Sequence, residues 1–154
     1  MVAKYYAVEV SENQVMHAIV TQKGDPYVPA YLLATAAFSK RAEADIKRGD
    51  TAGAATAIAA ESKMASAGIK ILSANPTWDP GPTMLPQFYA YEIQAVLLTK
   101  GCDPVIVPNL LKGQAASLKN AVPSSIKTQV IARQNVARAC PNLAKYTALP
   151  KQQQ

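Results

Sequence analysis

The pattern of hydrophobic and polar positions along the chain is typical of packed α-helices. Between residues 29 and 48, apolar side chains recur every three or four positions from Tyr31 to Ala42, so they share one side of a helix. The segment 52–73 is rich in alanine, the best helix former. Gly49-Asp50-Thr51 separates the two segments and supplies a helix stop followed by an N-cap residue. We therefore predict an antiparallel pair of helices joined by a tight turn.

Three more helices are predicted in the second half of the chain. The segment 86–100 is apolar on almost every side, which is typical of a helix in the buried centre of a bundle. Helices over 109–121 and 123–139 follow it, and Pro123 suits the first turn of the second one. Residues 74–86 are predicted to be a loop, because several prolines and a glycine there exclude a continuous helix.

The two ends of the chain have patterns of their own. Aromatic and β-branched residues gather at 4–10, which fits a short strand or an extended arm, and residues 1–10 are predicted to be an extended arm. Ser11-Glu12-Asn13-Gln14 has the form of a capping box and would open a helix over 12–22. The polar residues 149–154 are expected to be a frayed tail. The whole chain, 1–154, is predicted to be one all-α domain, a compact bundle of five or six helices.

The composition is that of a folded domain, but it does not determine the cellular compartment. Of the 154 residues, 49% are hydrophobic and only 17% charged, which is too apolar for a disordered chain. No run reaches the roughly eighteen apolar residues that a membrane-spanning helix needs. The N-terminal residues also lack the apolar core of a signal peptide. Either a cytosolic protein or a mature form that has lost its signal fits this observation.

The two cysteines bear on that choice. Cys102 and Cys140 each stand at the end of a predicted helix beside a proline segment. A metal site would need more ligands, and the only histidine, His17, is far away in the sequence, so it is a poor partner for a nucleophilic thiol. Two buried thiols or one disulfide are left, and we predict the disulfide. A disulfide slightly favours a periplasmic or secreted protein over a cytoplasmic one.

Catalytic motifs are absent from the sequence. It contains no nucleophile elbow, no phosphate-binding loop, no dinucleotide-binding glycine motif and no His/Cys cluster. Glu43 and Asp45 are two positions apart, hence on different sides of a helix, and are expected to be solvated. We predict no catalytic residue, no cofactor and no metal ion, and expect that the chain is not an enzyme. A hydrolase whose carboxylates are distant in the sequence is kept as an alternative.

Charge is distributed very unevenly between the two parts of the chain. Residues 1–103 carry nine Lys/Arg and ten Asp/Glu, whereas residues 104–154 carry seven Lys/Arg and no carboxylate, so net charges of −1 and +7 make up the formal +6. This pattern indicates a basic surface for an acidic partner, or an ordinary surface that pairs with acids of the first part. Nucleic acid is an unlikely partner, because the cations are singly spaced and Tyr146 is the only aromatic residue among them.

Six residues are predicted to bind that partner. Five are cations of the basic segment and the sixth is the tryptophan of the proline-rich loop: Lys112, Lys119, Lys127, Arg133, Arg138 and Trp78. Arg133 falls inside the apolar stripe of its predicted helix, so it would pair internally, for example with Glu92, or meet a partner's carboxylate. Trp78 would either anchor the partner or fold back over the bundle.

These features favour a non-catalytic protein-protein interaction module, namely an inhibitor, immunity factor or adaptor of bacterial or phage type that binds an acidic protein. A structural subunit of a virion or secretion assembly is an alternative, since an arm and a polar tail can become ordered when subunits associate. The hydrolase with dispersed carboxylates is the other. Self-association would favour the first alternative, and a deep pocket with converging acids would favour the second.

Overall fold

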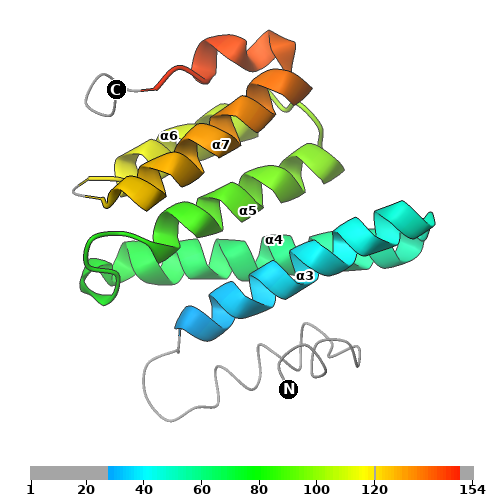
Figure 1. The fold of residues 1–154 in the computed structure, drawn as a ribbon, viewed down its shortest axis with the longest axis horizontal. Coiled ribbons are helices and arrows are strands. Elements are labelled where there is room, and N and C mark those ends of the chain that lie inside the picture. The colour runs from blue at the N-terminus through cyan, green and yellow to red at the C-terminus, as the bar shows by residue number, and fades with distance from the viewer. Residues whose placement is uncertain (1–27, 120, 150–154) are drawn as a thin grey trace.

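The computed structural model describes residues 28–119 and 121–149 as a bundle of helices (Figure 1). The all-α fold class is thereby confirmed, and the described residues contain no strand. In chain order the elements are α3 (Val28–Arg48), α4 (Thr51–Ala74), the 3₁₀ turn η1 (Pro76–Trp78), α5 (Met84–Thr99), α6 (Ile106–Ser117), α7 (Pro123–Ala139) and the 3₁₀ segment η2 (Pro141–Tyr146). The predicted arm at 1–10, the predicted helix at 12–22 and most of the predicted tail lie outside the described residues.

Helices α3 and α4 form the predicted antiparallel hairpin (Figure 1). Its turn works as the sequence indicates. Gly49 has a φ of 76°, in the left-handed region that glycine enters without steric cost. The Asp50 carboxylate then accepts a hydrogen bond from the backbone N–H of Gly53 at 2.9 Å and so caps the start of α4.

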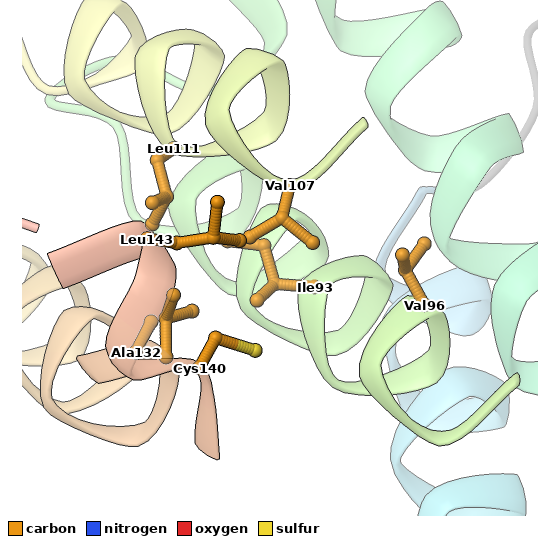
Figure 2. Packing of buried hydrophobic residues seen from close by; sticks show 8 residues of the cluster. Ile93, Val96, Val107, Leu111, Ala132, Cys140 and Leu143 are labelled. Carbon is orange, nitrogen blue, oxygen red and sulfur yellow. The ribbon is translucent and has the colours of Figure 1, made fainter. Parts of the chain in front are cut away.

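Helix α5 is the centre of the molecule, as its apolar sequence predicts. It packs between the α3–α4 hairpin and the pair of helices α6 and α7 (Figure 1). Phe88 of α5 belongs to a first core with α3 and α4, and its ring lies against the backbone of α4 at Gly68, where an added Cβ would come within 2.5 Å of it. Ile93 and Val96 belong instead to a second core with α6, α7 and η2 (Figure 2).

Two helices begin earlier than the sequence predicts, for one physical reason. α5 starts at Met84 rather than 86, and α6 starts at Ile106 rather than 109. Pro86 and Pro108 thus occupy the third position of their helices, within the first turn, where the missing N–H of proline is not needed. α7 has the predicted bounds, and α6 ends at Ser117, four residues before its predicted end at 121.

Carboxylates upstream of these two helices satisfy their first N–H groups. The Asp79 side chain accepts hydrogen bonds from the backbone N–H groups of Thr83, Met84 and Leu85 at 2.9–3.2 Å. Asp103 accepts bonds from the N–H groups of Val105 and Ile106 at 2.9 and 2.8 Å, and these bonds lower the pKa of its carboxyl. The proline-rich loop therefore holds an ordered cap for α5.

The predicted disulfide is confirmed. Cys102 and Cys140 are bridged, with their Cα atoms 5.5 Å apart, and the bond ties the α5–α6 connection to the end of α7. The Cys140 side chain is buried in the second core beside Ala132 and Leu143 (Figure 2). Among the described helices, no stretch has both the length and the apolar character needed to cross a membrane.

Candidate interaction groove

A groove runs between α5 and α7. It encloses about 650 Å³. Its apolar lining comes from both helices, with Ala90, Ile93, Leu97 and Leu98 on α5 and Ile131, Ala132 and Ala139 on α7. A volume of this size lies within the usual range for binding sites, about 300–1,000 Å³.

Two large apolar side chains in this groove are only half covered by the protein. Leu98 on α5 and Ile131 on α7 are each 48% exposed. Ile131 lies on a face of α7 whose other exposed side chains are polar, among them Lys127 and Asn135. Gln94 and Asn135 also line the groove, and their amides can donate and accept hydrogen bonds.

The charge at the groove has one sign. Arg138 is the only charged residue among those that line it, and its side chain is exposed. Lys127 is an exposed neighbour on the same helix, about 20° from Arg138 around the axis of α7 and about 40° from Ile131. Arg138 and Lys127, which we call the basic edge, therefore flank the half-exposed Ile131.

The structure separates the other predicted partner-binding lysines from this groove lining. Lys112 is exposed on α6 and Lys119 follows the end of that helix. Lys119 lines a second cavity of about 390 Å³, together with Asp79, Tyr89 and Gly113. The six predicted residues thus do not form one continuous site, and only Lys127 and Arg138 lie together on one face of α7 beside an apolar groove.

Arg133 is buried, so the prediction that it binds a partner is corrected. Its guanidinium donates hydrogen bonds to the backbone carbonyls of Tyr146 at 2.9 Å, Ala148 at 2.8 Å and Leu111 at 3.3 Å. The expected partner, Glu92, bonds elsewhere, to the Ser62 hydroxyl of α4. Burial lowers the pKa of Arg133 from its ordinary value. Arg133 therefore joins α7 to α6 and to the C-terminal segment, and it does not lie on the surface where a partner would meet it.

Trp78 takes the second of its two predicted positions. It closes the short η1 turn, is half-buried, and packs against the first core. The proline-rich loop is also fixed to α7, since the Ser125 hydroxyl donates to the Pro82 carbonyl at 2.8 Å. Trp78 accordingly contributes to the fold at this end of the bundle.

Sequence reasoning missed a pair of carboxyls between α4 and α5, of which one is fully buried and the other partly buried. Glu61 is fully buried, and its burial raises the pKa of its carboxyl to about 7, with nearby Glu92 adding to the rise and the Ser39 hydroxyl opposing it. Neither Glu61 oxygen has a hydrogen-bond partner of normal geometry among the described residues. Burial also raises the pKa of Glu92, whose oxygens both lie 3.0 Å from the Ser62 hydroxyl. Neither carboxyl lines the groove or the second cavity.

The expectation that Glu43 and Asp45 are both solvated is half right. Glu43 is exposed and pairs with Lys47 at 3.3 Å. Asp45 is fully buried at the C-terminal end of α3, where it forms ion pairs with Arg48 and, at 3.7 Å, with Arg41. These arginines lie three and four positions from Asp45 on the same helix, which brings their charges onto its side.

Comparison with protein-family models, with curated proteins and with solved structures finds no match to this chain. An apolar groove with side-chain amides and a cationic edge can hold an apolar surface, orient it by hydrogen bonds and attract a carboxylate. Those are properties of a recognition site.

Proposed function

We propose that this protein is a non-catalytic protein-protein interaction module, and that its acidic partner docks in the groove between α5 and α7 against the basic edge. One observation carries the proposal. The groove combines apolar side chains of two helices with a cationic edge and has no carboxylate among its lining residues. The basic segment from residue 104 to 154 supplies that edge, since it contains no acid that could neutralise it.

The energetics favour a partner with an apolar face. Covering the exposed halves of Leu98 and Ile131 would contribute about 1 kcal/mol each, because full burial of such a side chain is worth roughly 1.5–3 kcal/mol. Arginine is over-represented among the residues that dominate binding energy at interfaces. Arg138 beside these two side chains can add a charge-assisted hydrogen bond, and the whole basic edge raises the rate of encounter with an acidic protein.

The position of the buried acids supports a non-catalytic role. A hydrolase that uses a carboxyl pair needs both groups to reach a substrate. Glu61 is fully buried, Glu92 is partly buried, and neither lines the groove or the second cavity. The geometry therefore favours an interaction module over the hydrolase alternative.

The test is a comparative capture experiment with charge reversals. Wild-type protein, a Lys127→Glu/Arg138→Glu variant and a Lys40→Glu/Lys70→Glu control would each be immobilised and exposed to extract of the source organism, with bound proteins quantified by mass spectrometry. Both control positions are exposed lysines, on α3 and α4. An acidic protein should bind to the wild type and the control and be lost from the basic-edge variant. Equal recovery on all three proteins would refute the proposal.

A further inference from the structure

We infer that the element received by the groove is a single amphipathic α-helix of the partner, with an apolar face against Leu98 and Ile131 and a carboxylate against Arg138. This inference rests on the proposed function and specifies the kind of segment that the partner presents. It follows from three features of the groove: the repeat of its lining residues, the state of its backbone groups and the placement of its cations.

The lining residues repeat with helical spacing on both walls. On α5 they run from Ala90 to Leu98 and on α7 from Thr128 to Ala139, and each row advances by three or four positions. At 1.5 Å per residue these rows are about 12 and 16 Å long, which corresponds to two to three turns of a helix. A third helix laid along two others fits its own ridge of side chains, spaced at three and four, into rows of this kind.

The backbone of the groove has no free strand edge to offer a partner. Both walls are helices, whose N–H and C=O groups are used internally except at the helix ends, so neither wall presents a row of free backbone groups. An extended peptide gains most of its affinity from main-chain bonds to a free strand edge, and the described residues contain no strand. A segment that enters an apolar groove must therefore satisfy its own backbone, which a helix does.

The cations then set the polar positions of that helix. Lys127 and Arg138 are eleven positions apart on nearly the same face of α7, which places them about 16 Å from each other along the helix. A helix lying beside α7 would meet both with carboxylates about eleven residues apart, outside its apolar face. The Cys102–Cys140 disulfide restrains the backbone of α7 two residues beyond Arg138. A restrained wall loses less backbone entropy on binding.

The test uses a displayed library of random peptides of about 20 residues, long enough for five helical turns, selected on the full wild-type chain. Enriched peptides should carry apolar residues at spacings of three and four together with acidic residues, and their helical circular dichroism should increase on binding. Ile131→Glu should weaken binding by about thirty-fold or more, because it removes an apolar contact and also places a carboxylate where binding would desolvate it. Ile46→Glu, at a position of α3 with 50% exposure, should leave it unchanged.

Arg138 is tested with the selected peptides themselves. Arg138→Gln and removal of the paired peptide carboxylate should each weaken binding, and the two losses should be less than additive, as expected for groups in contact. Three results would overturn the inference: enriched peptides that bind in extended form, equal effects of Ile131→Glu and Ile46→Glu, or no enrichment at all. A groove filled by a second copy of the chain would also overturn it, and sedimentation would then show a dimer that Ile131→Glu dissociates.

The two experiments can refute the helical ligand and the proposed function independently of each other. If the acidic protein is captured through the basic edge but the selected peptides are extended, the interaction module stands and only the helical form of its ligand is wrong. If the basic-edge variant captures the same proteins as the wild type, the proposed function itself fails.

Discussion

At the residue scale, the described part of the chain accommodates four buried charged side chains in different ways. Asp45 lies between two arginines, Asp79 accepts backbone N–H groups, and Arg133 donates to backbone carbonyls. Glu61 has no such partner among the described residues. Because an unpaired charge is costly in a protein interior, burial raises the pKa of the Glu61 carboxyl to about 7.

Glu61 should therefore make stability depend on pH. Its folded-state pKa of about 7 lies above the ordinary value of 4.5, so the folded protein binds more protons between these two values. The free energy of unfolding should fall as pH rises from about 4.5 to 7, by up to roughly 3 kcal/mol. Glu61→Gln should remove most of that slope in urea unfolding curves, whereas Glu43→Gln, on the exposed side of α3, should keep it. The same slope in the wild type and Glu61→Gln would contradict this account.

Arg133 should be a determinant of stability. Arg133→Met leaves three carbonyls without their donor, so the free energy of unfolding should fall by about 2–4 kcal/mol. Arg133→Lys should recover only part of this loss, because an ammonium group cannot reproduce the fork of the guanidinium. Arg138→Met on the exposed face of the same helix should change stability by less than about 0.5 kcal/mol. Thermal melting of the three variants compares these effects, and equal melting temperatures for Arg133→Met and Arg138→Met would show that Arg133 has no such role.

Sequence reasoning was only partly successful for single residues. It placed Arg133 in an apolar stripe, because helical spacing is a local property, but its carbonyl partners depend on how the chain turns after α7. The Glu61–Glu92 pair was missed because its members belong to different helices. A usable signal existed, since Glu61 lies about 40° from Ala65 and from Ala57 around the axis of α4, in the middle of the buried face.

At the scale of elements, the helices followed from the sequence, but the starts of two of them did not. Periodicity and helix propensity predict α3, α4 and α7 to within one residue of their observed bounds. The observed starts of α5 and α6 lie two and three residues before the predicted starts at 86 and 109. Asp79 and Asp103 cap these helices from upstream, so the first turn extends before the proline.

The disulfide is the covalent link between elements, and its contribution can be measured. Titration of the unfolded, unreduced protein should detect no free thiol, and two free thiols per chain would contradict the bridge. Cys102→Ser/Cys140→Ser should lower the free energy of unfolding by up to about 4 kcal/mol, the chain-entropy value for a loop of this length. The same double variant should also loosen the end of α7, seen as faster amide hydrogen exchange at Ala137 and Arg138 than in the wild type.

At the scale of the whole molecule, the sequence predicts the architecture better than the site. A helix that is apolar on almost all sides is expected in the centre of a bundle, and α5 lies there. Its buried side chains contribute to two cores, Phe88 to the first and Ile93 and Val96 to the second. The groove depends on the distance at which α5 and α7 pack, which the second core and the disulfide determine together. The residue pattern of a single helix does not determine its distance from another helix, so the groove could not be predicted from the sequence.

The basic character of the molecule should not make it a nucleic-acid binder, although its calculated pI is about 9.4. Its predicted partner-binding cations are distributed over α6, the segment after it and α7, one of them is buried, and they do not follow a single track that phosphates could match. Fluorescence anisotropy with labelled DNA and RNA at physiological salt should therefore show no binding at micromolar concentrations. Micromolar affinity that falls steeply with added salt would contradict this prediction.

The claim that the groove between α5 and α7 is the docking surface is tested most directly by calorimetric titration of the captured partner against two matched variants. Ile131→Glu and Ile46→Glu place the same charge at isoleucines that are 48% and 50% exposed, the first in the groove and the second on α3. We predict that Ile131→Glu weakens the partner's affinity by about thirty-fold or more, because it removes an apolar contact and also places a carboxylate where binding would desolvate it, and that Ile46→Glu leaves it within about twofold. Equal affinities for the two variants would contradict the account.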